Sequence, residues 1–198
     1  PLIGTDAFTA FLGVLSNPIV GILLGLVLTV IVQSSSATVG MVQTVASVAA
    51  NDPSVTFTFA MAYPIIMGIN LGTCVTTAMV CSIGSSKDAK RTGVVHIAFN
   101  TIGTVLFMIV MSILQNMQAF GAEFWSAIVD SGGIANFQTI FNLITAVILI
   151  PFADQLVKLS LKVVKDVPEK THNHPELYTL DSKLYISPAV AVGEATKA

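Results

Sequence analysis

The sequence predicts an all-α integral membrane protein, and three observations lead to that fold class. Hydrophobic residues make up 54% of the 198 residues. Charged residues make up only 10%, whereas soluble domains carry about 25%. The charges are also segregated, because no Asp, Glu, Lys or Arg occurs in 53–86, 92–122 or 131–153. Each of these neutral stretches is long enough to cross a bilayer with a hydrocarbon core of about 30 Å.

Two apolar stretches have the length of ordinary transmembrane helices. Residues 92–114 and 134–157 each provide more than twenty residues, and an α-helix rises about 1.5 Å per residue. We therefore expect two full spanning helices in the second half of the chain.

The first half of the chain consists of shorter apolar pieces separated by polar segments. Residues 18–32 and 37–50 flank the sequence QSSS, whereas 57–67 and 74–83 flank the sequence GINLGT. Each piece covers only about half a bilayer, roughly 15–22 Å. We expect a re-entrant helical hairpin with QSSS at its tip, followed by a broken transmembrane helix. Half-helices that meet at polar, glycine-containing breaks are typical of a transporter's binding site.

The polar breaks carry neutral groups that can bind ions. The helices that begin after Ser36 and after Gly72 would direct their amino-terminal N–H groups toward the membrane centre, which favours an anion. Because no Lys or Arg lies nearby, an anion in this low-dielectric site needs a cation beside it. Hydroxyl, carbonyl and amide oxygens suit an alkali ion such as sodium. A structural explanation stays open, because membrane Ser and Thr often bond to their own helix or join helices.

Four segments resemble the type II sodium/phosphate cotransporter family. They are NPIVGILLGLVLTVIVQSSSATVG, YPIIMGINLGTCVTTAM, KRTGVVHIAFNTIG and IANFQTIFNLITAVILIPF, within about residues 1–154. They are most similar to the second of two inverted repeats in bacterial members. The resemblance implies sodium-driven import of inorganic phosphate by alternating access.

The resemblance also implies the binding residues. The implied phosphate ligands are Gln33, Ser34, Ser35, Ser36, Asn70 and Thr73. The implied sodium ligands are Gln33, Ser34, Ser36, Asn70 and Thr73. Sodium is then the co-transported ion, and we expect no organic cofactor, no enzymatic activity and no nucleic-acid partner.

The sequence departs from the family pattern in two respects. The family has two QSSS-bearing repeats and this sequence has one. We therefore expect an inverted partner repeat, from the same full-length chain or from another subunit, to complete the site. Gln138 stands where the family leads us to expect His, which argues against a proton-linked role for this position while keeping a hydrogen-bonding side chain.

The basic residues predict the orientation in the cytoplasmic membrane. Lys87, Lys90 and Arg91 precede one predicted span and further lysines follow the other, whereas loop 115–133 has no base. The positive-inside rule places the loop from Lys87 to Arg91 and the C-terminal tail in the cytoplasm, and Asp52 outside. We expect 1–165 to form the transmembrane domain and 166–198 a cytoplasmic linker. The tail segment YTLDSKLYISPAVAVGEATKA is similar to the family's linker to a PhoU-like helical domain.

Two other functions stay open at this point. The chain could be a phosphate-sensing membrane anchor or a channel that uses the same site without coupled transport. An intramembrane serine protease would pair one serine of QSSS with His96. No G-x-S-x-G sequence is present, however, and a hydrogen bond between helices is the commonest explanation for a histidine such as His96.

Overall fold

The structure is a computed structural model that describes residue 10 and residues 12–165. The described residues form helices joined by turns and loops, with one isolated β-bridge between Thr58 and Ile128, which confirms the all-α class. The elements in chain order are α2 (Pro18–Val32), α3 (Ser35–Asn51), α4 (Phe59–Ser82), α5 (Lys87–Asn116), α6 (Ala122–Ser126), α7 (Ser131–Leu149), η1 (Ile150–Phe152) and α8 (Ala153–Val163). The predicted tail 166–198 lies outside the described residues, and the boundary after residue 165 stays a prediction.

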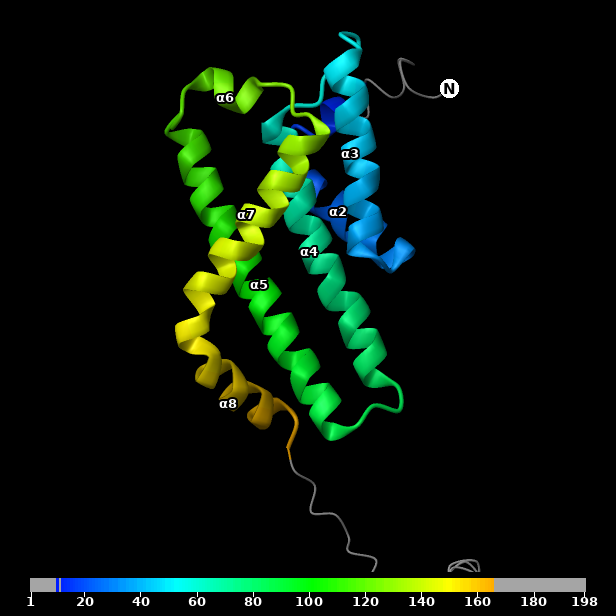
Figure 1. Cartoon of the computed structure of the whole chain (residues 1–198), viewed down its shortest axis with the longest axis vertical. Coiled ribbons are helices and arrows are strands. Elements are labelled where there is room, and N and C mark those ends of the chain that lie inside the picture. Colours follow the sequence, from blue (N-terminus) through cyan, green and yellow to red (C-terminus); the bar gives the residue numbers. More distant parts are fainter. Residues whose placement is uncertain (1–9, 11, 166–198) are drawn as a thin grey trace, which may run out of the picture. The chain divides into compact units, whose positions relative to one another are not determined.

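Within the described part of the chain, three helical stretches are long and apolar enough to cross a membrane. They are Phe59–Ser82, Lys87–Asn116 and Ser131–Val163. The start of α4, the end of α5 and the start of α7 lie at one end of the bundle, and α8 lies at the other (Figure 1). The end of α3 shares the first of these ends, so both arms of the hairpin enter from the same side. The segments that the sequence placed on one side share one end of the bundle, whereas the side of the membrane that each end faces stays a prediction.

The predicted hairpin is present, and its turn is shorter than QSSS. α2 has 15 residues and α3 has 17, so the arms are about 22 and 26 Å long. Only Gln33 and Ser34 separate them. Gln33 has a left-handed φ of 56° and ends α2, whereas Ser34 is extended and caps α3 by accepting a hydrogen bond from the Ala37 N–H. Ser35 and Ser36 already belong to the first turn of α3.

The predicted break at GINLGT is wrong, because α4 runs through it without interruption. The glycines of this segment serve close helix packing instead. A Cβ added at Gly68 would collide with the carbonyl oxygen of Ile22, and one at Gly72 would lie 2.6 Å from the Cβ of Thr29. Glycine therefore lets α2 and α4 approach backbone to backbone, which is a common use of small residues in membrane helices.

α2 and α4 run parallel, as the order of their contacts shows. Gly21 lies beside Pro64, Gly25 beside Ile65, and Thr29 beside Gly72. The residue numbers rise together along both helices, which an antiparallel pair would not allow. This register carries the end of α2, and with it the tip of the hairpin, toward the C-terminal half of α4.

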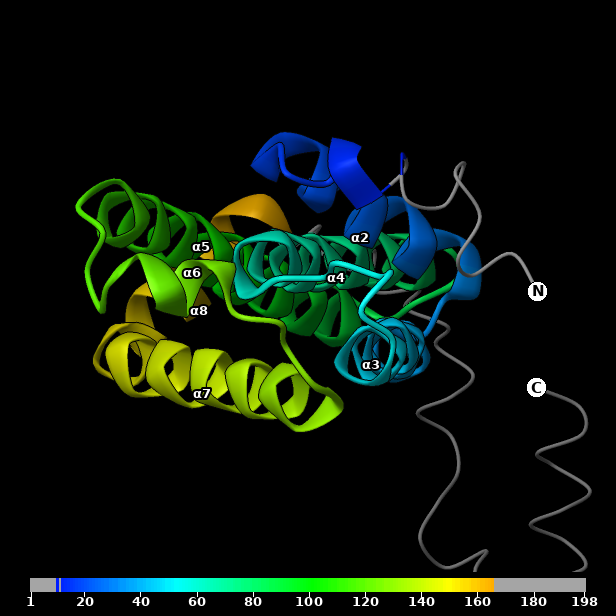
Figure 2. The same cartoon turned by 90° about the horizontal axis from the view of Figure 1, so that it is seen from above.

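α4 is the central helix of the bundle. Every residue from Met61 to Asn70 is buried, and the view from above shows α4 between α2, α3, α5 and α7 (Figure 2). A helix that is buried on all sides needs no polar face, which explains its nearly uniform apolar sequence in this part. Polar side chains here must find partners within the protein.

The second predicted span, 134–157, is divided at Pro151. α7 ends at Leu149, a single 3₁₀ turn follows, and α8 then leaves the direction of α7 (Figure 1). Proline lacks the N–H that continues a helix and disturbs the preceding turn. α7 alone has 19 residues and is about 28 Å long, which is already close to the thickness of a bilayer's hydrocarbon core.

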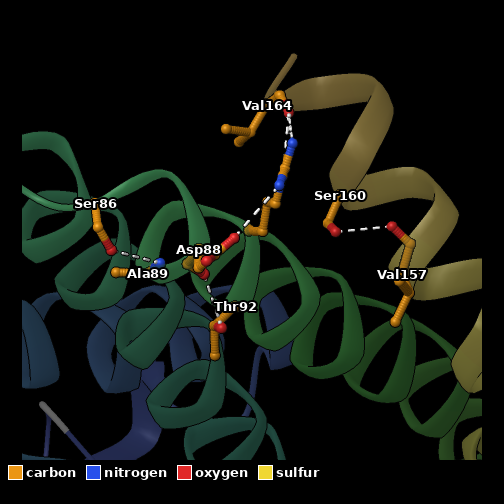
Figure 3. A network of polar contacts seen from close by, with 8 residues as sticks. Ser86, Asp88, Ala89, Thr92, Val157, Ser160 and Val164 are labelled. Carbon is orange, nitrogen blue, oxygen red and sulfur yellow. Dashed lines mark hydrogen bonds and ion pairs between the residues drawn. The ribbon is translucent and has the colours of Figure 1, made fainter. Parts of the chain in front are cut away.

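The end of α8 is hydrogen-bonded to the start of α5. The Arg91 guanidinium donates to the carbonyl oxygen of Val164 from Nε and Nη2, both at 3.4 Å, and pairs with Asp88 at 3.3 Å. Figure 3 shows Val164 at the end of α8 and Asp88 on α5. A cation at the end of a helix also interacts favourably with its dipole. These contacts fix the point at which the chain leaves the bundle.

Candidate functional site

The tip of the hairpin borders a cleft beside α4. This cleft has a volume of about 290 Å³ and is lined by Gln33, Thr76, Thr77, Met79, Val80 and Cys81. Gln33 and Ser36 are exposed, whereas Ser34 and Ser35 are half-buried. None of the lining residues carries an acidic or basic group. Gln33 at the tip therefore shares an uncharged cleft with the hydroxyl-bearing residues Thr76 and Thr77 of α4.

The first turn of α3 offers unpaired backbone donors. Ser34 accepts hydrogen bonds from the N–H of Ala37 at 3.3 Å and of Thr38 at 3.0 Å, through its hydroxyl and carbonyl oxygens. The N–H groups of Ser35 and Ser36 have no intrahelical partner, because the carbonyl groups four residues before them do not belong to α3. Together with the positive end of the helix dipole, these amides can bind an anion.

Asn70 and Thr73 precede the cleft residues along α4, and each already has hydrogen-bond partners. The Asn70 Nδ2 donates to the Ile66 carbonyl at 2.8 Å and to the Gln138 Oε1 at 3.3 Å. The Thr73 hydroxyl donates to the Ile69 carbonyl at 3.0 Å. In the described part of the chain, no hydrogen bond joins either residue to Gln33 or the three serines. The structure thus places the six predicted ligands in two separate groups.

Two residues of the cleft were missed by the sequence analysis. Thr76 and Thr77 follow Thr73 by three and four positions, so all three share one face of α4. That spacing was a usable signal, but the expected helix break directed attention to GINLGT. Gln138, in contrast, was singled out for its departure from the family pattern, and the structure brings it to Asn70.

His96 forms the expected hydrogen bond between helices. Its Nδ1 lies 3.0 Å from the hydroxyl oxygen of Thr77, so α5 contacts α4 at the wall of the cleft. Among the described residues, no hydrogen bond joins His96 to a serine. A catalytic Ser–His pair, which requires such contact, is therefore absent from this arrangement.

Ionisable groups are sparse around the site. The residues that the structure describes contain no group of three His, Cys, Asp or Glu that could hold a metal ion. At the open end of the hairpin, Ser54 donates two hydrogen bonds to the carboxylate of Asp52 and lowers the pKa of that carboxyl below its ordinary value. Any ion at the tip would meet neutral oxygens and backbone amides.

Comparison with known proteins gives a consistent set of relatives. Residues 2–132 match the family described as Na⁺/Pi-cotransporter. The human sodium-dependent phosphate transport protein 2B is 30% identical over 159 residues, which cover 78% of this chain and 21% of that protein. The Bacillus subtilis protein YqeW is 30% identical over 138 residues, or 70% of this chain and 41% of that protein.

The name of a further relative states a direction of transport. A Salmonella typhimurium protein, provisionally named for inorganic phosphate export, is 24% identical over 140 residues, covering 70% of this chain and 24% of that protein. No solved structure matches the chain. The chain spans between about one fifth and two fifths of the length of these relatives.

Proposed function

Because the chain belongs to the Na⁺/Pi-cotransporter family, we propose that it forms half of a transporter that imports inorganic phosphate with sodium. The depth of the hairpin tip carries the proposal. Thr76, which lines the same cleft as Gln33, lies about 26 Å along α4 from Phe59 and about 9 Å from Ser82. An exposed polar turn at this depth along apolar helices is costly in lipid unless it serves a ligand or a partner.

Phosphate binds at the amino terminus of α3 in this proposal. The amides of Ser35 and Ser36 and the hydroxyls of Ser34, Ser35 and Ser36 supply donors, with the helix dipole adding a favourable field. The Gln33 carboxamide contributes a further donor. Asn70 and Thr73 approach from α4, and each would exchange a present hydrogen bond for one to the ligand.

Sodium binds next to the phosphate and offsets its charge. The proposed ligands are neutral oxygens of Gln33, Ser34, Ser36, Asn70 and Thr73. These ligands are proposed on chemical grounds. Hard cations prefer oxygen ligands, and burying an anion without a counter-charge at this depth costs free energy. Coupling follows, since each ion makes the site more favourable for the other.

The opposite wall of the site comes from an inverted partner repeat. Gln33 and Ser36 are exposed in this chain, and lipid would leave their polar groups unsatisfied at several kcal/mol each. The relatives are also two to five times longer than the aligned region. A second QSSS-bearing repeat, from the same full-length protein or another subunit, would cover the tip and allow alternating access.

The orientation follows from the basic residues. We place the protein in the cytoplasmic membrane, with the loop from Lys87 to Arg91 and the tail after residue 165 on the cytoplasmic side. The loop between α5 and α7 and the open end of the hairpin then face outward. The tail would serve as a linker to a cytoplasmic domain.

A second candidate function is supported by the relative named for phosphate export. Export, or an uncoupled channel or sensing role, would use the same neutral site without an inward sodium gradient. The discriminating experiment reconstitutes the intact protein into liposomes and measures entry of labelled phosphate. We expect accumulation above the external concentration only with an inward sodium gradient. Equal uptake with a potassium gradient would contradict sodium coupling.

A further inference from the structure

Thr77 does not follow the hydrogen-bonding pattern that six other helical threonines share. Six threonines donate their hydroxyl hydrogen to the carbonyl four residues earlier: Thr29, Thr38, Thr44, Thr73, Thr92 and Thr139. Such bonds commit the hydroxyl to its own helix. Thr77 instead pairs with the Nδ1 of His96 at 3.0 Å, on the neighbouring helix α5. The orientation of its hydroxyl is therefore set by His96.

The pairing decides what the cleft offers to a ligand. In the tautomer that carries its hydrogen on Nε2, His96 accepts at Nδ1, and the Thr77 hydroxyl is then the donor of this hydrogen bond; the inference takes this tautomer. Thr76 likewise donates to the Thr73 carbonyl at 2.9 Å. A hydroxyl has one hydrogen and two lone pairs, so both threonines keep only acceptor capacity for the cleft. Together with the Gln33 carboxamide oxygen, they present oxygen acceptors and no charged group.

We propose that His96 is a positioning residue for a sodium-binding position formed by Gln33, Thr76 and Thr77. His96 does not touch the ion; it fixes the hydroxyl of Thr77, a residue that lines the same cleft as Gln33 at the hairpin tip. Neutral oxygen acceptors suit a small hard cation, whereas phosphate needs donors. The inference rests on the proposed function, because it takes sodium as the cargo, and it adds a cation position on the α4 side of the tip.

The test measures the sodium dependence of phosphate uptake by the intact protein in liposomes. Thr77→Val removes the hydroxyl with little change in shape, and His96→Leu removes its partner. We expect each to raise the half-saturating sodium concentration about tenfold, the effect of losing about one hydrogen bond to a charged group. Because the defect is in affinity, higher sodium should restore most of the uptake.

Two further variants separate positioning from a merely structural role. His96→Asn places an amide oxygen close to the position of Nδ1, so it should accept from Thr77 and stay within about threefold of the unaltered protein. Thr139→Val is the matched control, because this exposed threonine bonds only to the Ala135 carbonyl on α7. It should leave the half-saturating sodium concentration unchanged.

The proposal is overturned if Thr77→Val leaves the sodium dependence unchanged, or if His96→Asn is as impaired as His96→Leu. The double variant Thr77→Val/His96→Leu should match Thr77→Val alone, because both changes act through one hydroxyl; additive losses would contradict this. If His96→Leu does not insert into the membrane, Thr77→Val and His96→Asn decide the question. Uptake by the unaltered protein that ignores sodium would overturn the proposed function as well, which separates the two failures.

Discussion

Asn70 of α4 and Gln138 of α7 exchange hydrogen bonds through their side-chain amides. The Asn70 Nδ2 lies 3.3 Å from the Gln138 Oε1, and the Gln138 Nε2 lies 3.5 Å from the Asn70 Oδ1. Asn70 is only 5% exposed, so water cannot easily replace this partner. The pair joins two helices in the apolar part of the bundle, where a buried amide without partners is costly.

The first prediction concerns this amide pair. Gln138→Leu should lower the free energy of unfolding by about 1–3 kcal/mol, because it leaves the Asn70 carboxamide oxygen buried without a donor. The measurement is the unfolding midpoint of the purified protein in detergent. Asn142→Leu is the control, since Asn142 is exposed and bonds only to the Gln138 carbonyl of its own helix. Equal midpoints for both variants would show that the pair does not stabilise the bundle.

The second prediction concerns the hairpin tip. Ser36→Leu should reduce sodium-dependent phosphate uptake by at least about tenfold, which corresponds to a loss of only about 1.4 kcal/mol of binding. The side chain is exposed, so the bundle should still fold. Ser47→Leu places the same leucine at an exposed position farther along α3 and should keep normal uptake. Undiminished uptake by Ser36→Leu would remove the tip from the proposed site.

The third prediction tests why GINLGT contains glycines. Gly68→Ala should destabilise the protein by about 1–3 kcal/mol through overpacking, because its Cβ would collide with the Ile22 carbonyl. Gly40→Ala, on α3, meets nothing within 4 Å and should stabilise by about 0.5–1 kcal/mol. Unfolding midpoints compare the two. A neutral Gly68→Ala would indicate that α2 and α4 are not packed backbone to backbone.

The membrane class and the hairpin could be predicted from sequence because their signals have one physical meaning. Long neutral stretches must lie in lipid, and a polar QSSS between two half-length apolar runs leaves few alternatives to a turn. Ser34 is a residue type that favours the N-cap position, whereas the left-handed backbone of Gln33 is uncommon for glutamine and could not be predicted.

GINLGT could not be interpreted in the same way. Glycine in a membrane helix permits either unwinding or close packing, and the choice depends on which helix lies opposite. Gly68 of α4 packs against α2, and Gly25 of α2 packs against α4, only because the two helices are parallel. The sequence alone does not reveal which helices pair or in which register. The pairing of Thr77 with His96 was hidden for the same reason, since it depends on the crossing of α4 and α5.

The fourth prediction concerns orientation. In a protein whose Cys74 and Cys81 are replaced by alanine, Ile83→Cys should react with a membrane-impermeant thiol reagent from the cytoplasmic side. Met117→Cys should react from the outside. Both native side chains are exposed, at 82% and 73%. Ile83 follows α4 and Met117 follows α5, and these two helices end at opposite ends of the bundle (Figure 1). Labelling of the two positions from one side would contradict the helical arrangement, and the reverse pattern would invert the topology.

The most direct test of the central claim is an experimental structure of the intact protein with sodium and phosphate. We predict phosphate within hydrogen-bonding distance of Ser35 and Ser36 at the start of α3, with a second QSSS segment facing the tip across a polar cavity. An inverted partner repeat should supply that segment. A phosphate bound elsewhere, with Gln33 and Ser36 in contact with lipid, would contradict the account.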